Sequence, residues 1–200
     1  MHIPGGYLSP QTYVPCYIGA AAFLSLGLKK IRTEVSSGQV PYFAMAAAFA
    51  FLIQMFSIPI PGGTTGHAVG AAVVALLLGP WTAVVAVSVV LIIQAIVLGD
   101  GGITAIGANI LTMAVVMPFT ASWLFRLIGG GGRTLRRTVI AAFIAGYVSL
   151  LVAAVGAAFL FGIQPVIASG PDGRPLYAPY PLSIALPVMA AEHMFIFSMV

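Results

Sequence analysis

The stretch from Trp81 to Leu98, WTAVVAVSVVLIIQAIVL, decides the fold. It carries no charged side chain, and at ~1.5 Å per helical residue it is long enough to cross most of a ~30 Å hydrocarbon core. The rest of the chain has the same character, since 60% of its 200 residues are hydrophobic and only 6% are charged. That is too little polar surface to cover a water-soluble globule, so the chain is predicted to lie in a membrane.

Six further apolar stretches lie on either side of this one, and most of them approach the ~20 residues that a spanning helix needs. They are Tyr13–Leu28, Val40–Ile58, Gly66–Leu78, Ile103–Ile128, Thr138–Ile163 and Tyr180–Val200. The pattern predicts an all-α polytopic membrane protein of about seven transmembrane helices. We expect residues 1–200 to form a single integral membrane domain.

Basic residues fall between the spans and predict how the helices are oriented. They form two groups, one after the first span and one around the link between the fifth and sixth: Lys29, Lys30 and Arg32, then Arg126, Arg133, Arg136 and Arg137. A seven-span chain puts both groups on one side, which the positive-inside rule assigns to the cytoplasm. The amino terminus is therefore predicted outside and the carboxyl terminus inside. Because these charges mark topology, the net charge of +4 does not indicate nucleic-acid binding.

The third span is unusually short, since Gly66–Leu78 covers only about 20 Å as a helix. The preceding segment, Ile58–Gly66, is apolar at its start, is broken by two prolines and is rich in glycine. It is predicted to be non-helical backbone that enters the outer leaflet as a recessed external loop. His67 would then lie in the first turn of the short helix, at the floor of an external recess.

The first two residues, Met1 and His2, form a potential metal chelate. The α-amine of Met1, the peptide nitrogen of His2 and its imidazole can close two fused rings around one divalent ion. His67 is predicted on the same external face and can supply a fourth nitrogen. The amino terminus lacks the basic leading region and the small-residue cleavage site of a secretory signal, so we expect Met1 to be retained.

Three more residues on this face are candidates for a supporting role. Thr64 and Thr65 can orient His67 by hydrogen bonds, which metal-binding histidines commonly need. Asp100 stands in a Gly-Asp-Gly-Gly sequence and is by default a turn residue, so we place it no closer than the second layer around the metal. Taken singly, His2 is more often a disordered terminal residue, and His67 is as often a polar cap on a helix end as a ligand.

A second set of polar residues is predicted inside the spans. It comprises Gln54, Gln94, Asn109, Glu192 and His193. Glu192 and His193 lie near the predicted midplane of the last span, where ionisable residues usually have a partner or a function. We expect Glu192 to join helices by a hydrogen bond to Asn109, Gln54 or Gln94, with a role in transport as the alternative.

Four separated motifs resemble the substrate-capture subunits of nickel and cobalt energy-coupling factor transporters, the NikM/CbiM family. They occur in the family's order and read MHIPGGYLSP at 1–10, GGTTGH at 62–67, LGDGGITAIGAN at 98–109 and LPVMAAE at 186–192. The resemblance implies that Met1, His2 and His67 hold the metal. His193 departs from the pattern, because the family usually has a small residue after the glutamate.

The resemblance also implies partners and a location. Such a substrate-specific subunit assembles with a transmembrane coupling subunit, a pair of cytoplasmic ATPases and often a small accessory membrane subunit, in the cell membrane of a prokaryote. The chain contains no Gly-x-x-x-x-Gly-Lys-Ser/Thr phosphate loop, so ATP hydrolysis is expected in the partners and the chain is not expected to be an enzyme. No cofactor is expected either.

The ligand set favours particular ions as cargo. An amine, a deprotonated amide and imidazoles suit square-planar metal ions, and affinity rises from Co²⁺ through Ni²⁺ to Cu²⁺. We expect Ni²⁺ as the transported ion and Co²⁺ as the second choice.

Two other functions compete with transport. A seven-helix chain with an external amino terminus is also typical of a membrane receptor, although the last span has no lysine for a retinal Schiff base. An intramembrane enzyme could use Glu192 and His193, but no convincing nucleophile accompanies them in the sequence, and there is no His-Glu-x-x-His motif.

Overall fold

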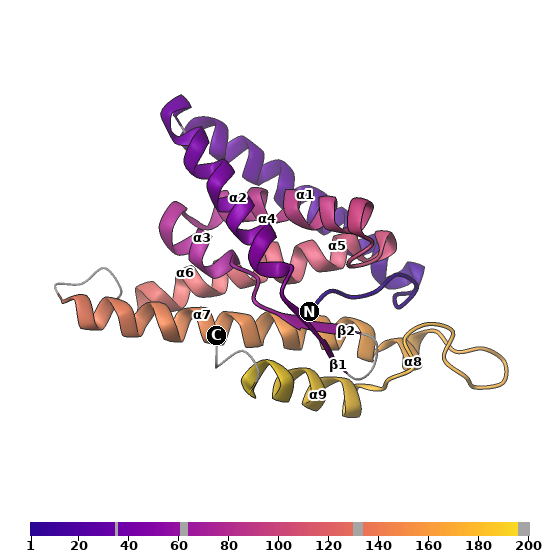
Figure 1. Ribbon diagram of the computed structural model, residues 1–200. Coiled ribbons are helices and arrows are strands. Elements are labelled where there is room, and N and C mark those ends of the chain that lie inside the picture. Colours follow the sequence, from indigo (N-terminus) through magenta and orange to yellow (C-terminus); the bar gives the residue numbers. More distant parts are fainter. Residues whose placement is uncertain (35, 61–63, 130–133, 196–200) are drawn as a thin grey trace.

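The computed structural model describes residues 1–34, 36–60, 64–129 and 134–195, and for residues 34, 37, 60, 64, 65 and 195 it describes the backbone only (Figure 1). The α-helices are α1 (Pro10–Glu34), α2 (Val40–Gln54), α3 (Ala71–Leu78), α4 (Pro80–Ile93), α5 (Ile106–Asn109), α6 (Met117–Ile128), α7 (Leu135–Gly162), α8 (Gln164–Ile167) and α9 (Leu182–Phe195). Two strands, β1 (Ser57–Ile60) and β2 (Thr64–His67), form an antiparallel hairpin. The 3₁₀ turns are η1 (Ser37–Gln39) and η3 (Ile103–Ala105), and the π-helical segments are η2 (Gln94–Leu98) and η4 (Ile110–Val116).

The helices confirm the prediction of an all-α polytopic membrane protein. In the described residues, four continuous helical runs are long and apolar enough to span a bilayer: Pro10–Thr33, Pro80–Leu98, Ile103–Ile128 and Leu135–Ile167. The shorter helices α2, α3 and α9 fall in the three remaining predicted spans. The π-helical segment η2 continues α4, and η4 joins α5 to α6, so each of these pairs forms one continuous helical rod. With these rods, each of the seven predicted spans corresponds to one rod among the described residues.

Small side chains let these rods pack closely. Helix α7 lies between α6 and α9 (Figure 1) and contacts both. On α7, Ala153, Ala154, Ala157 and Ala158 are fully buried. A Cβ atom added to Gly107 of α5 would lie 2.7 Å from the backbone nitrogen of Tyr17, so α1 and α5 meet backbone to backbone. Such contacts are typical of membrane helices, where dispersion and fit replace the hydrophobic effect.

The two groups of basic residues lie toward one end of the molecule. Helices α1 and α6 end, and α7 begins, on the left of Figure 1, whereas α8 and the connection to α9 lie on the right. Lys29, Lys30 and Arg32 belong to the end of α1, Arg126 to the end of α6, and Arg136 and Arg137 to the start of α7. Arg133 lies outside the described residues. This agrees with the predicted separation of charge along the helix bundle.

The third span differs from its prediction. Helix α3 begins at Ala71 and not at Gly66, because Gly70 has a left-handed backbone (φ +74°) that interrupts a right-handed helix. The predicted non-helical segment pairs with itself instead, with Ser57 opposite His67 and Ile58 opposite Gly66. His67 is therefore the last residue of β2 and does not lie in the first turn of a helix. The positive end of that helix dipole is consequently not at the histidine.

Candidate metal centre

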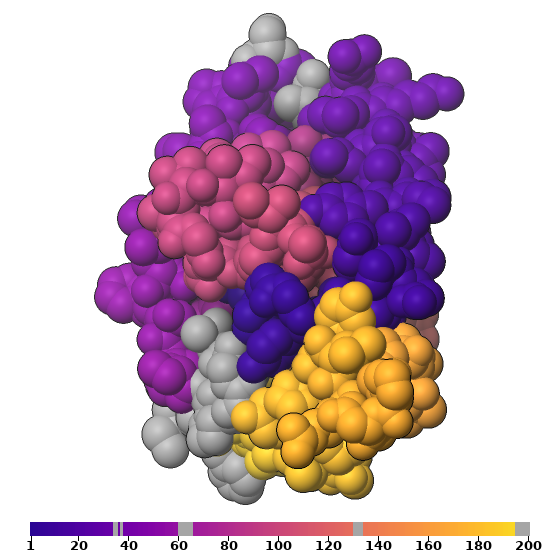
Figure 2. Space-filling view, turned by 90° about the vertical axis from the view of Figure 1, so that its right-hand side faces the viewer, coloured from indigo at the N-terminus to yellow at the C-terminus, as the bar shows by residue number. Residues whose placement is uncertain are grey.

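The amino-terminal segment is irregular backbone that enters the interior of the protein. Met1 and Ile3 are fully buried and His2 is 3% exposed. In Figure 2 the residues that come after Ile3 in the chain are indigo. They fill the gap between the pink segment near residue 100 and the orange to yellow segment after residue 165. Burial of a chain terminus requires partners for its backbone groups, because an unpaired N–H or C=O in the interior costs ~1–3 kcal/mol.

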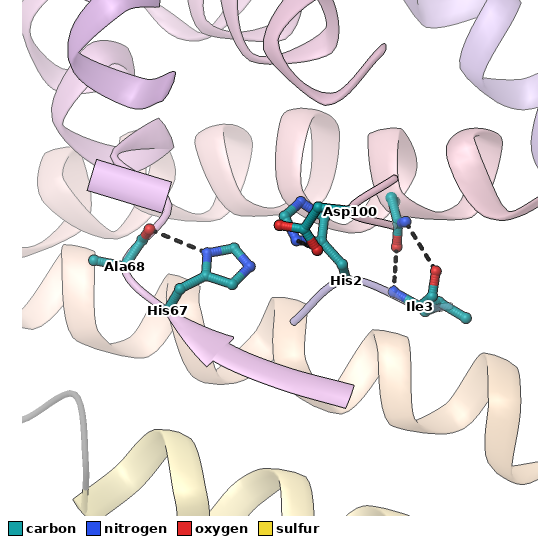
Figure 3. Close-up of polar contacts among 6 residues, drawn as sticks. His2, Ile3, His67, Ala68 and Asp100 are labelled. Atoms are coloured by element: carbon teal, nitrogen blue, oxygen red, sulfur yellow. Dashed lines mark hydrogen bonds and ion pairs between the residues drawn. The ribbon is translucent and has the colours of Figure 1, made fainter. Parts of the chain in front are cut away.

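Asn109, the last residue of α5, supplies hydrogen-bond partners for the backbone of Ile3. Its Oδ1 accepts a hydrogen bond from the Ile3 N–H at 2.9 Å, and its Nδ2 donates to the Ile3 carbonyl at 3.3 Å (Figure 3). The side-chain amide thus pairs with the backbone as a neighbouring strand would. This pairing fixes the position of the residue that directly follows His2.

Gln164 fixes the other end of the segment. Its Oε1 accepts a hydrogen bond from the Ser9 N–H at 2.9 Å, while its Nε2 donates to Thr12 Oγ1 at 2.9 Å and to the Leu160 carbonyl at 2.7 Å. Ser9 and Pro10 then start α1, since the Ser9 carbonyl accepts the first helical hydrogen bonds. The amino-terminal segment is held at both ends by buried amide side chains.

Glycines in the loop 99–102 let the backbone approach this segment. A Cβ atom on Gly102 would lie 2.0 Å from Gly5 Cα, so the two backbones are in direct contact there. Gly101 has φ +73°, and a Cβ atom there would lie 3.0 Å from His2 Cδ2. The Gly-Asp-Gly-Gly sequence is therefore a close-contact surface for the terminus as well as a turn.

His67 reaches the same place from strand β2. Its Nδ1 lies 3.2 Å from the Ala68 carbonyl, which identifies Nδ1 as the nitrogen that carries the proton (Figure 3). Its Nε2 then keeps a lone pair. This Nε2 is buried and has no hydrogen-bond partner among the described residues. A buried nitrogen lone pair that has no hydrogen-bond partner is available to bind a metal ion.

The rings of His2 and His67 stack with their centroids 4.5 Å apart and their planes 25° apart. Asp100 lies next to the His2 ring, with its Oδ1 3.1 Å from His2 Nδ1 (Figure 3). The side chain of Asp100 is 32% exposed, whereas both histidines are buried. The structure places the rings of His2 and His67 together at the buried amino terminus, and Asp100 contacts His2 directly.

Burial sets the charge state of the terminus. Desolvation lowers the pKa of the Met1 amine from 8.0 to about 4, against an opposing effect of the Asp100 charge. Burial also lowers the pKa of His2, although Asp100 favours its protonated form. For Asp100, burial acts to raise the pKa, but the hydrogen bond and charge of His2 outweigh it and the net shift is downward. At neutral pH the amine is uncharged and its lone pair can bind a metal.

The other predicted residues have different surroundings. The side chains of Thr64 and Thr65 lie outside the described residues. Gln54 donates through Nε2 to the Val69 carbonyl at 3.0 Å, just after His67. The hydrogen bonds of Gln54 and Asn109 go to the backbone of Val69 and Ile3, and the expected bonds of Glu192 stay a prediction. These amides support backbone around the amino terminus.

His193 is fully buried in α9, where its Nδ1 lies 2.8 Å from the Met189 carbonyl. The carbonyl of residue i−4 is a common partner for a polar side chain inside a helix. The described residues contain no group of three histidine, cysteine, aspartate or glutamate side chains arranged for a metal ion. A metal ion bound at the amino terminus would therefore need the terminal amine and backbone as ligands, as well as side chains.

Gln164 is a structural residue of this site that the sequence did not indicate. It lies 155 positions from Ser9, at the start of the short helix α8, and nothing local to it signals a partner at the amino terminus. Gly5 and Gly102 were visible as glycines within the motifs, but their mutual contact depends on the tertiary structure.

Comparison with known proteins identifies the family that the chain resembles. Residues 2–200 match the family model CbiM, described as the cobalt uptake substrate-specific transmembrane region. The chain is 50% identical over 196 residues to a fused nickel transport protein NikMN of Rhodobacter capsulatus, covering 97% of this chain and 56% of that protein. It is 41% identical over 195 residues to a putative metal transport protein of Methanocaldococcus jannaschii, covering 97% and 83% of the two chains.

A solved structure shares the fold. A crystal structure described as a truncated transition metal transporter superposes with a TM-score of 0.93 at 42% sequence identity, covering 98% of this chain and 90% of that one. This chain spans little more than half the length of the fused nickel transport proteins that it matches.

Proposed function

This chain belongs to the family of cobalt uptake substrate-specific transmembrane regions, and we propose that it captures Ni²⁺ for uptake at a site formed by the Met1 amine, His2 and His67. Co²⁺ is the second candidate. The chain is a multi-pass membrane protein of a prokaryotic transport family and not an enzyme, so capture and release of an ion, rather than catalysis by Glu192 and His193, is the function to test.

One observation carries the proposal. The stacked rings of His2 and His67 lie beside a terminal amine whose pKa burial lowers to about 4. Burying an amine is unfavourable unless something is gained by it. A neutral amine, a peptide nitrogen and two imidazoles offer four nitrogens to one ion, and the amino terminus is held in place by Asn109 to present three of them.

The donor set supports Ni²⁺ over Co²⁺. Four nitrogen donors that include a deprotonated amide favour square-planar geometry, which suits Ni²⁺. Loss of the His2 amide proton also reduces the positive charge left inside the protein, because one of the two cationic charges is neutralised. Asp100, at 3.1 Å from His2, can neutralise part of the remainder.

Transport then requires other proteins. We propose that the chain acts in an energy-coupling factor transporter, with a transmembrane coupling subunit, a pair of cytoplasmic ATPases and a small accessory membrane subunit. The fused nickel transport relatives support this assignment. The proposed orientation has the amino terminus outside, so that the metal centre faces the side from which the ion arrives.

The decisive experiment compares two purified proteins, one that begins at Met1 and one with a single alanine added before Met1. Both are titrated with NiCl₂ by calorimetry and by visible absorption. We expect one Ni²⁺ per chain and the absorption band of a square-planar complex for the native terminus, with binding lost in the extended protein.

A matched control tests whether the two proteins are folded alike. Both proteins should elute as single species in detergent and should have similar content of helix by circular dichroism, because the extension changes one end only. Equal binding by the two proteins would exclude the terminal amine as a ligand. Absence of binding by both would contradict the capture site itself.

A further inference from the structure

The chelate proposed above dictates which nitrogen of His2 meets the metal. The Met1 amine and the His2 amide nitrogen close a five-membered ring with the ion. The amide nitrogen and Nδ1 of the same residue close a six-membered ring, whereas Nε2 lies on the far side of the imidazole and cannot close one. Once Nδ1 binds the ion, the proton of the neutral ring resides on Nε2, and this N–H needs an acceptor in a buried site.

Gln94, the first residue of η2, is placed to be that acceptor. Its side chain is fully buried, and neither its Oε1 nor its Nε2 has a well-formed hydrogen bond among the described residues. A buried amide without such partners is costly, so its presence beside a candidate metal ligand points to a role when the metal is bound. The Gln94 amide also raises the pKa of the His2 ring, as a hydrogen-bond acceptor does.

The backbone of Gln94 fixes its position relative to Asp100. Its carbonyl accepts hydrogen bonds from the N–H of Gly99 and from the N–H of Asp100, the latter at 3.1 Å. Gln94 and Asp100, the two residues beside His2, therefore belong to one hydrogen-bonded turn at the end of η2. Gly99, with φ +70°, permits this turn.

We propose that Gln94 is a positioning residue of the metal centre, whose Oε1 accepts the Nε2–H of His2 and so presents Nδ1 to the ion. This inference rests on the proposed function. Asp100 occupies Nδ1 at 3.1 Å before the ion arrives, and it is partly exposed and able to turn away. Gln94 is fully buried, so its side chain stays inside the protein beside the ring when Asp100 gives way to the ion.

The test replaces Gln94 in the full chain with a native amino terminus. Gln94→Leu keeps the approximate volume but removes the acceptor, and Gln94→Glu restores one. Loss of a hydrogen bond to a metal-binding histidine typically weakens metal affinity 10- to 100-fold. We therefore expect Gln94→Leu to weaken Ni²⁺ binding about 10- to 100-fold, and Gln94→Glu to recover most of that loss. The square-planar absorption band should persist in Gln94→Leu at saturating Ni²⁺.

A spectroscopic measurement separates orientation from mere packing. Square-planar Ni²⁺ is diamagnetic, so ¹⁵N-histidine NMR can be recorded on the loaded protein. We expect the Nε2–H proton of His2 to show the downfield shift of a strong hydrogen bond in the original protein and to lose it in Gln94→Leu. Ser88→Ala, which removes a buried hydroxyl from α4, is the control and should leave this signal unchanged.

The outcomes distinguish the two proposals. If the original protein binds no Ni²⁺, the capture site fails and this inference fails with it. If the original protein binds Ni²⁺ but Gln94→Leu binds equally well with the same His2 signal, the role of Gln94 is wrong and the capture site stands. A Gln94→Leu protein that has lost affinity but kept the downfield His2 proton would also overturn the role.

Discussion

The amino-terminal segment, residues 1–9, and helix α2 are stabilised in opposite ways. The segment has no regular structure, yet Met1 and Ile3 are fully buried. Helix α2 is regular along its length, yet Met45 and Leu52 are 60% and 62% exposed. The helix satisfies its own backbone hydrogen bonds and can face lipid, whereas the irregular segment borrows its partners from distant residues.

This difference locates function in the irregular region. Asn109 and Gln164 each hydrogen-bond to one backbone position of the amino-terminal segment. If either side chain is removed, no neighbouring residue replaces its hydrogen bond. Exposed apolar residues of α2 are expected to contact lipid chains, which adapt to any similar side chain. Mutations of equal size should therefore have very different effects in the two regions, and the following predictions test this from the largest effect to the smallest.

Replacement of His67 by alanine should have the largest effect, because it removes one of four nitrogen donors. We expect Ni²⁺ affinity to fall more than ~100-fold, beyond the loss typical of a supporting residue, and the square-planar band to change. Calorimetry and visible absorption measure both. His193→Ala serves as the comparison, since that histidine is equally buried. A larger loss for His193→Ala than for His67→Ala would return attention to Glu192 and His193 as an alternative centre.

Gly102→Ala should displace the amino-terminal segment, because the new Cβ atom would lie 2.0 Å from Gly5 Cα. Overpacking of this kind costs about 3 kcal/mol, which corresponds to an affinity loss of about 100-fold if the segment moves. Gly146→Ala is the matched control, because a Cβ atom there meets nothing within 4 Å. Equal Ni²⁺ affinity for the two variants would show that the backbone contact is not needed for binding.

Asn109→Leu should release the terminus from its pairing. It leaves the Ile3 N–H and C=O without their partners, at ~1–3 kcal/mol for each unsatisfied group. If docking of the terminus becomes ~2 kcal/mol less favourable, Ni²⁺ affinity falls about 30-fold. Hydrogen exchange at the Ile3 amide, measured by NMR, should become faster. Unchanged exchange would contradict the anchoring role of Asn109.

The buried amine predicts how stability of the metal-free protein varies with pH. Its pKa is about 4 when folded and 8.0 when unfolded, so between these values the unfolded chain binds a proton that the folded protein does not. Stability therefore rises with pH, by about 2 kcal/mol from pH 6 to pH 8. The lowered pKa of His2 acts in the same direction.

Thermal unfolding in detergent at pH 6, 7 and 8 measures this effect, which corresponds to about 4–8 °C in the midpoint. The protein with an added residue before Met1 should show a smaller slope, because its amine is no longer held at the same buried position. A midpoint that is independent of pH would mean that the amine is not buried in the neutral state.

Leu52→Ala should have the smallest effect. Leu52 is 62% exposed on α2 and is expected to contact lipid, so its loss should change stability by about 0.5 kcal/mol or less. Ni²⁺ affinity of the purified chain should be unchanged, as measured by calorimetry. A loss comparable with that of Asn109→Leu would remove the contrast between the two regions.

The fold could be predicted largely from hydrophobicity. Length and apolar character placed the long rods, because a bilayer demands ~20 apolar residues of any spanning helix. The error occurred at His67, where the prediction extended the third helix through Gly70. A left-handed glycine and the pairing of β1 with β2 decide that boundary, and neither depends on apolar periodicity.

The candidate site could be predicted in part. The chelating chemistry of Met1 and His2 is local, so it could be read from two adjacent residues. The contact between Asp100 and His2 joins residues far apart in the chain, and a turn sequence alone did not indicate it. The proposed hydrogen bonds of Glu192 were inferred from depth in the membrane alone, which does not specify the direction in which a side chain points.

The sequence by itself therefore determined that this protein lies in a membrane, because that depends on composition. It also determined which atoms are available to bind a metal, because those belong to neighbouring residues. Only the tertiary structure decided that those atoms converge. It buries the amino terminus against the backbones of Gly5 and Gly102, pairs Ile3 with Asn109 and stacks His2 on His67. The physical reason is that buried irregular backbone must find its hydrogen-bond partners in space, and no local pattern records where they lie.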